Sequence, residues 1–194
     1  ASIGNDQLMI KTPKFIAVGL CFIAAYQCTT AKELKLDNLF PKDRLLEVNI
    51  PVAEQDWDKI RYQRRTRENA LPPSRQFEPP PPPYSYVEAS VTIDGVTFPK
   101  VGLRKKGFLG SQDTTRPSLK VRLDYIEKEG NIDGLQNLTL NNNRQDTSLM
   151  SQFIGYAIWD AAGAPGSRCA FAKVMVNGRN LGVYCHVETI REPG

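Results

Sequence analysis

Apolar and polar residues alternate on both sides of the dipeptide Asp94-Gly95, from Tyr86 to Lys106. Side chains that alternate in this way lie on opposite faces of a strand, and Asp-Gly is a favoured two-residue turn because it tolerates positive φ angles. The pattern therefore predicts a β-hairpin with a bulge at Pro99. The residues expected to face each other across it are Ile93 with Val96 and Val91 with Phe98.

Four other segments show the same alternation: residues 45–52, 118–125, 170–176 and 181–188. Pro51 favours an edge position for the first of them, because proline cannot donate to a strand ladder. The last two segments are joined by residues 177–180, which begin with Asn-Gly, and they are expected to form a second hairpin.

Two helices are expected. Residues 54–67 have Trp57 and Ile60 at helical spacing, which is typical of a short surface helix. A clearer helix follows Asp146, a candidate cap, and ends near Gly163. Several hairpins around one long amphipathic helix predict an α+β fold with a mainly antiparallel sheet. The apolar stripe of that helix is expected to lie in the core, and it consists of Leu149, Met150, Phe153, Ile154, Ala157, Ile158 and Ala161.

Composition narrows the classes of function. The chain has one histidine, His186. A multi-histidine metal site is therefore excluded, and His186 is the one residue that could serve as the base of a Ser/His/Asp triad. The formal net charge of +4 does not by itself indicate binding to nucleic acid or to a membrane surface. The basic residues also lack interleaved exposed aromatic residues, and we therefore expect no nucleic-acid partner.

The N-terminal residues resemble a targeting segment. Lysines precede an apolar run of about twelve residues, Phe15 to Tyr26, which is too short for a membrane-spanning helix and suits a secretory signal peptide. We expect residues 1–28 to be upstream sequence and signal peptide, residues 29–194 to be the folded part, and the protein to be secreted or held in the cell envelope. A lipid anchor on Cys28 is the less favoured alternative, because bulky residues precede it.

Two cysteines remain in the expected folded part, Cys169 and Cys185. If Val176 faces Leu181 in the second hairpin, the two sulfurs point to opposite sides of the sheet. We therefore expect two free, packed cysteines, and a disulfide would need a bulge or a shift in register.

A proline-rich stretch covers residues 68–84 and includes five consecutive prolines, Pro79 to Pro83. Such a run favours polyproline II, which is stiff and solvated. A spacer or loop within the domain is the favoured interpretation, and a ligand for an aromatic groove is the alternative.

Four cations share even parity on the strands at 96–106 and 118–125: Arg104, Lys106, Lys120 and Arg122. If these strands pair directly, the cations lie on one face of the sheet. Next to the loop with Gly107, Gly110 and Ser111, such a face could hold phosphate oxygens. From spacing alone, an ordinary solvated face beside a flexible loop is the favoured interpretation, and the phosphate site is the alternative.

Four motifs occur in the order found in the spore coat protein H (CotH) kinase-like family, and the chain resembles that family from about Leu45 to Ile190. They are VGLRKKGFLGS (101–111), PSLKVRLD (117–124), GLQNLTLNNNRQDTSLMSQFIGYAIWDAAG (134–163) and VMVNGRNLGVYCHVETI (174–190). The resemblance implies an N-terminal lobe of an atypical protein-kinase-like fold. It also implies ATP and Mg²⁺ or Mn²⁺ as cofactors, and phosphorylation of a protein substrate.

By the same resemblance, residues Gly107 to Ser111 correspond to the loop over the nucleotide phosphates. Lys120 is the first candidate for the phosphate-binding lysine, and Arg104 and Lys106 are second choices. Glu188 is expected near the nucleotide edge or hinge. The helix has Gln152 and no acid between Asp146 and Asp160, so the ion pair between lysine and helix that kinases use is in doubt.

The metal-binding and catalytic carboxylates of the family are expected after Gly194, so this chain alone is expected to have little or no kinase activity and to expose an apolar face. The alternative function is a secreted or surface-attached module that binds a protein or glycan without phosphoryl chemistry.

Overall fold

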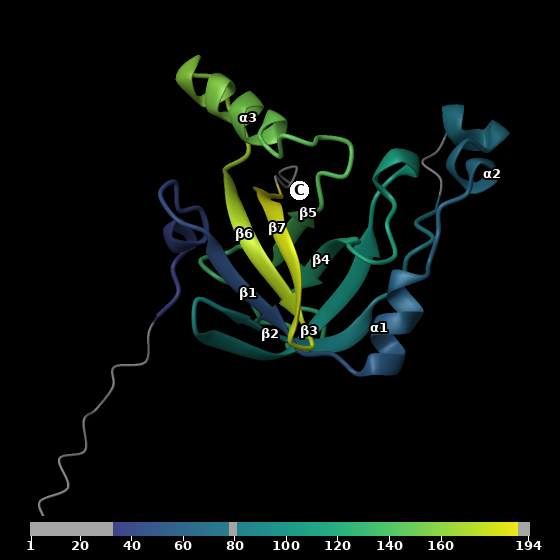
Figure 1. Ribbon diagram of the computed structural model, residues 1–194, viewed down its shortest axis with the longest axis horizontal. Helices are drawn as coiled ribbons and strands as arrows, with labels where there is room; N and C mark the ends of the chain where they lie inside the picture. The colour runs from purple at the N-terminus through teal and green to yellow at the C-terminus, as the bar shows by residue number, and fades with distance from the viewer. Residues whose placement is uncertain (1–32, 78–80, 190–194) are drawn as a thin grey trace, which may run out of the picture. The chain divides into compact units, whose positions relative to one another are not determined.

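The computed structural model describes residues 33–77 and 81–189. Its centre is a closed barrel of seven strands in the order β1-β2-β3-β4-β5-β7-β6 (Figure 1). The strands are β1 (Leu46–Ile50), β2 (Val87–Ile93), β3 (Val96–Lys106), β4 (Ser118–Arg122), β5 (Asn137–Asn141), β6 (Cys169–Val176) and β7 (Arg179–Glu188). The expected signal peptide and Cys28 lie outside the described residues, as do parts of the proline run.

Closure of the barrel corrects the expected fold class. β1 pairs antiparallel with β2 and parallel with β6, so it is not an edge strand. Pro51 lies just after β1 and therefore removes no ladder hydrogen bond from it. The fold is a closed barrel with few helices, and the expectation of an α+β kinase-like lobe with a long amphipathic helix was wrong.

The hairpin around Asp94-Gly95 was predicted correctly. Ile93 faces Val96 and Val91 faces Phe98, and both turn residues have positive φ. The register then shifts between Ala89 and Val91, opposite the expected bulge at Pro99.

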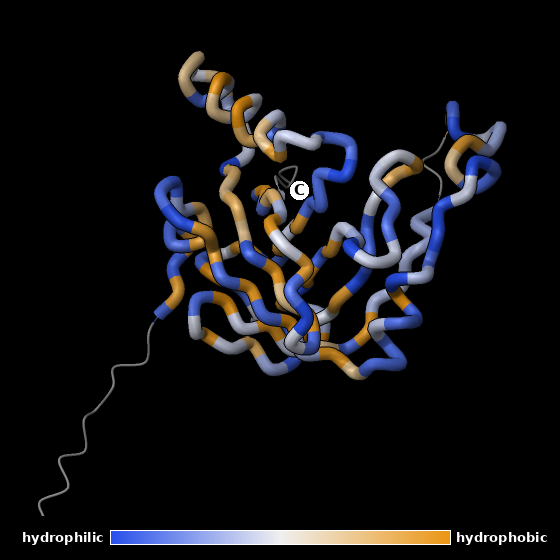
Figure 2. The backbone as a smooth tube through the Cα atoms, viewed as in Figure 1, coloured by the Kyte–Doolittle hydropathy of each residue, from blue (hydrophilic) through white to orange (hydrophobic). Residues whose placement is uncertain are grey.

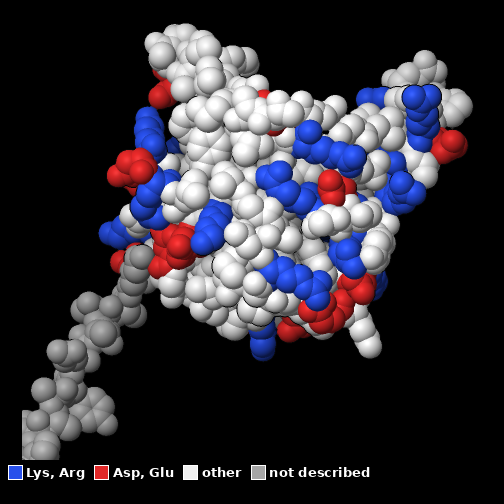
Figure 3. All heavy atoms as spheres, viewed as in Figure 1, with Lys and Arg blue, Asp and Glu red and all other residues white. Residues whose placement is uncertain are grey.

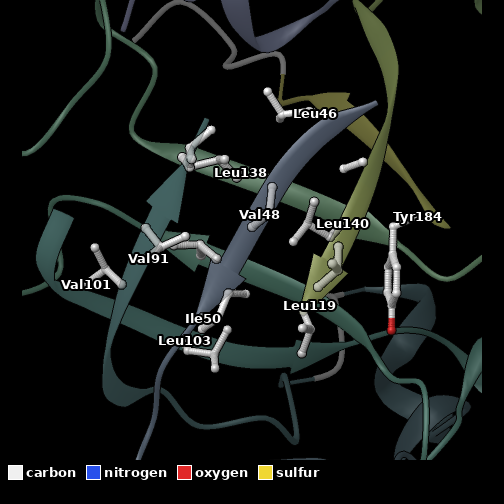
Figure 4. Close-up of a cluster of buried hydrophobic side chains, with 14 of the residues drawn as sticks. Leu46, Val48, Ile50, Val91, Val101, Leu103, Leu119, Leu138, Leu140 and Tyr184 are labelled. Atoms are coloured by element: carbon white, nitrogen blue, oxygen red, sulfur yellow. The ribbon is translucent and has the colours of Figure 1, made fainter. Parts of the chain in front are cut away.

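The barrel interior is filled by the alternate residues of its strands, as Figure 4 shows for Val48, Leu119 and Leu140. In β1 and β5 these inward residues are fully buried, and the residues between them are half-buried or exposed. Figure 2 shows the same alternation of apolar and polar residues along the strands. Burial of this apolar set is what stabilises the barrel.

Three α-helices lie among the described residues: α1 (Glu54–Arg61), α2 (Arg67–Ala70) and α3 (Ser151–Ala161). Short 3₁₀ turns cover Leu36–Leu39, Pro73–Gln76 and Leu109–Ser111. α1 buries Trp57 and Ile60, as its spacing predicted. Lys105, which is almost fully buried, donates from Nζ to the Arg61 carbonyl (2.7 Å) and so fixes the end of α1 against β3.

The expectation that the apolar stripe of α3 lies in the core was wrong. None of its residues is buried, and Ile154, Ile158 and Trp159 are 46%, 61% and 58% exposed. The helix extends away from the end of β6 and is largely apolar in Figure 2. Phe153 of this helix stacks on Phe171 of β6 (5.0 Å between ring centres).

The register of β6 and β7 also differs from the expected one. The turn contains only Asn177 and Gly178, so Val176 faces Arg179. A bulge at Leu181 then shifts the pairing by one residue, and Cys169 faces Val187 while Cys185 faces Phe171. Because a one-residue shift exchanges the faces of a strand, both cysteines lie on the same side of the sheet.

No helix among the described residues is long and apolar enough to span a bilayer.

Candidate functional site

A cavity of about 490 Å³ lies where the end of β3, the loop after β5 and the start of α3 meet. Cations, hydroxyls and amides dominate its lining, and Asp146 is its one carboxylate. The polar lining residues are Arg65, Lys106, Ser111, Ser118, Asn141, Asn142, Asn143, Arg144, Gln145, Asp146, Ser151 and Gln152. This donor set suits an anion better than an apolar ligand.

Lys106 is one of three cations in the cavity lining, with Arg65 and Arg144, and it is held by a chain of hydrogen bonds. Its Nζ donates to Asn141 Oδ1 (2.7 Å), and the Asn141 amide donates in turn to Gln152 Oε1 (2.9 Å). Burial, followed by the positive charges of Lys120 and Arg104, lowers the pKa of Lys106 to about 8. An anion bound near the Lys106 ammonium would stabilise its charged form. It would replace the solvation lost by burial, and its negative charge would offset the repulsion from Lys120 and Arg104.

The pairing of β3 with β4 brings the four predicted cations to one face. Arg104 faces Lys120, and Gly102 faces Arg122, with all four cations on the outer side of the barrel. Lys120 and Arg104 are neighbours of Lys106 but do not line the cavity. Figure 3 shows Lys and Arg side chains gathered over the region where Figure 1 draws α1, α2 and the end of β3.

The predicted loop forms one wall of the cavity. Gly107 has φ +129°, and its carbonyl accepts a hydrogen bond from the Tyr84 hydroxyl (2.8 Å). Ser111 Oγ accepts from the Phe108 amide (3.0 Å), which closes the turn over Gly107. Gly110 does not line the cavity, and it packs against the Gln145 side chain.

We expect Gly107→Ala to lower the free energy of unfolding by about 1 to 2 kcal/mol more than Gly134→Ala does. Both glycines have positive φ, but a Cβ at Gly107 would meet Ser111 Oγ at 2.7 Å, whereas a Cβ at Gly134 meets nothing within 4 Å. Urea denaturation of the two variants measures the difference. Equal losses would show that the Ser111 contact does not shape the loop.

Glu188 does not line the cavity at Lys106. Its carboxylate binds the Arg168 guanidinium through two oxygens (2.9 Å each), and this contact lowers the pKa of Glu188. It lines a second cavity, of about 430 Å³, with Leu36 and Asp133. Its expected role at the nucleotide edge stays a prediction.

Sequence reasoning gave no role to the asparagines after β5. Asn142 is buried, and its Nδ2 donates to the carbonyls of Ser111 (3.1 Å) and Arg116 (2.8 Å), so it ties the β3–β4 loop to the wall of the cavity. The run Asn141 to Asn143 was visible within a family motif. Its function depends on contacts with residues about thirty positions away, which no local pattern contains.

Among the described residues that line the cavity, Asp146 is the one carboxylate that could serve as a metal ligand. Asp146 accepts hydrogen bonds from the backbone amides of Ser148 (3.1 Å) and Ser151 (2.8 Å), so its oxygens are engaged at the start of α3. Among the described residues, no three His, Cys, Asp or Glu side chains gather as metal ligands. The cavity fits phosphate oxygens, and the described residues by themselves do not form a cage for a divalent ion.

Comparison with known proteins agrees with the sequence motifs. No curated protein matches the chain. Residues 103–193, which include the end of β3, all of β4 to β7 and most of the cavity lining, match the family described as CotH kinase protein. The match confirms the resemblance to the CotH kinase protein family over residues 103–193.

Proposed function

We propose that the cavity at Lys106 binds the phosphates of ATP, that Mg²⁺ or Mn²⁺ would enter with the nucleotide and not on a cage of the described residues, and that the protein is a secreted CotH-type kinase acting on a protein substrate. The observation that carries this proposal is the position of Lys106: a largely buried ammonium group, at the wall of a polar cavity, held by an amide oxygen. The family match supports the nucleotide as the ligand.

In this proposal Lys106 takes the role that sequence reasoning gave first to Lys120. Its ammonium group would donate to a phosphate oxygen while Asn141 and Gln152 fix its direction. In this proposal the amide side chains of Asn141 and Gln152 replace the lysine–glutamate ion pair that kinases use. An amide leaves the charge of the lysine uncompensated, so the full charge is available to the ligand.

Arg65 and Arg144 supply further charge at the cavity. The Arg65 guanidinium lies over the Phe108 ring (5.6 Å to the centroid), and Arg144 lies near Asp113 (3.7 Å). Guanidinium groups bind phosphate through two parallel hydrogen bonds. A divalent ion, when bound, would neutralise charge on the phosphates.

Isothermal titration calorimetry with ATP and Mg²⁺ or Mn²⁺ tests this proposal. We expect Lys106→Met to weaken binding about 10- to 100-fold, because a charge-assisted hydrogen bond is lost, and Lys120→Met to weaken it by less than about 5-fold. Affinity is also expected to fall as pH rises above about 8, where Lys106 loses its proton. The ATP affinity of the Lys106→Met protein should not change with pH over this range.

Equal effects of the two substitutions would overturn the assignment to Lys106. Failure of the wild-type chain to bind ATP or inorganic triphosphate would overturn the phosphate site itself. Circular dichroism of each variant checks that the barrel is folded.

A second candidate is a non-catalytic module that binds a protein. The exposed apolar side chains of α3 favour it, since Ile158 and Trp159 are more than half exposed on one short helix. No binding of ATP, together with tight binding of an apolar peptide that Trp159→Ser abolishes, would support this second function over the first.

A further inference from the structure

Cys169 and Cys185 lie side by side on the outer face of the barrel. The bulge at Leu181 sets Cys169 opposite Val187 and Cys185 opposite Phe171, so the cysteines are diagonal neighbours across the β6–β7 ladder. Their Sγ atoms are 3.0 Å apart, and both thiols are free. Two sulfurs this close need only a small movement to reach bonding distance.

We propose that Cys169 and Cys185 form a reversible disulfide by exchange with a small disulfide of the glutathione type. The family match and the proposed nucleotide site do not require this pair. The inference rests on the ladder register, the contact between the sulfurs and the access to Cys169.

The two cysteines differ in access. Cys185 is fully buried, whereas Cys169 is half-buried and lines a cavity of about 360 Å³ between α3 and the barrel. Lys42 and Arg168 also line this cavity. Arg168 is already bound by Glu188 and Asp37, so the Lys42 ammonium supplies the attraction for a carboxylate of oxidised glutathione near Cys169, and it is opposed in part by Asp160 in the same lining.

The exchange then has two steps. Cys169 gives its proton to solvent, and its thiolate attacks one sulfur of the reagent, whose other sulfur leaves as a thiolate and takes up a proton. The Cys185 thiolate attacks Cys169 Sγ in the mixed disulfide and releases the second thiol. The protein loses two electrons and two protons, and one reagent disulfide is reduced to two thiols.

The bond would fasten the first residue of β6 to β7, where the chain enters the barrel from α3. It closes a loop between residues 16 positions apart. A loop of this length lowers the entropy of the unfolded chain enough to raise the melting temperature by about 5 to 10 °C.

Peptide mapping of the full chain tests the proposal. The folded protein is equilibrated with oxidised glutathione, alkylated and digested with trypsin, which yields Cys169 in residues 169–173 and Cys185 in residues 180–191. We expect these two peptides to be linked and to separate after reduction with dithiothreitol. Differential scanning fluorimetry should show the higher melting temperature in the oxidised sample.

Matched variants separate this pair from the other cysteines. Cys169→Ser and Cys185→Ser should each remove the thermal shift, and a double Cys21→Ser, Cys28→Ser variant should keep it. Recovery of both peptides in alkylated or glutathione-bound form would overturn the proposal. A link that forms only in urea would also overturn it, because the native register would then not bring the sulfurs together.

Discussion

Between pH 7 and pH 4, the free energy of unfolding is expected to fall by about 3 kcal/mol because of His186. The ring is fully buried inside the barrel and stacks on Phe40 (4.8 Å between ring centres). Its Nδ1 lies 3.3 Å from the Thr139 carbonyl, and Nε2 has no hydrogen-bond partner among the residues that the structure describes. A proton added at Nε2 would therefore be a buried, unsolvated charge.

The pKa of His186 differs between the folded protein and the unfolded chain, and this difference sets the direction of the change in stability with pH. Burial lowers the pKa of His186 from 6.5 to about 4 in the folded protein, against which the Thr139 carbonyl and Glu188 act only partly. Between these values the unfolded chain binds the proton and the folded chain does not. Stability is thus full above about pH 6.5 and is lost as the pH falls toward 4.

Urea denaturation at several pH values, on the wild type and on His186→Phe, measures this contribution. Phenylalanine keeps the stack on Phe40 and cannot titrate. Carboxylates whose pKa is lowered, such as Glu188 and Asp113, make stability depend on pH in both proteins. The difference between the two curves of unfolding free energy against pH therefore isolates the contribution of the histidine. Parallel curves would mean that His186 does not face the barrel interior.

Leu140→Ala is expected to lower the free energy of unfolding by about 3 kcal/mol, and Ile158→Ala by less than about 0.5 kcal/mol. Leu140 is fully buried in the barrel, so its truncation leaves a cavity. Ile158 is 61% exposed on α3, and alanine is the better helix former at such a position.

The same urea assay measures both variants, and each acts as the control for the other. Similar losses would show that α3 packs into a core, as the sequence pattern alone suggested. A small loss for Leu140→Ala would instead count against the closed barrel, because β5 would then lack a filled interior.

Local patterns determined several parts of this protein. The hairpin at Asp94-Gly95 has the expected facing pairs, because a two-residue turn fixes register over a few residues. The buried face of α1 follows from its helical spacing. The cations Arg104 and Lys120 face each other because β3 pairs directly with β4, which was the condition set for them to share a face.

Tertiary structure decided the rest. The parallel pairing of β1 with β6, which closes the barrel, joins residues more than a hundred positions apart, and β1 has the same alternation whether it lies at an edge or inside a sheet. The exposed face of α3 could not be distinguished from a core face, because periodicity identifies an apolar stripe but not what covers it.

The Lys106 cavity and the Cys169–Cys185 pair also depend on tertiary contacts that no local pattern contains. The sequence contained Lys106, Asn141 and Gln152, but only the folded barrel joins them in one chain of hydrogen bonds. It contained Cys169 and Cys185, but a single bulged residue decided that their sulfurs meet. Alternation and turn residues thus determined the strands, and four ordered motifs carried the family resemblance, whereas contacts distant in sequence decided the fold class and the sites.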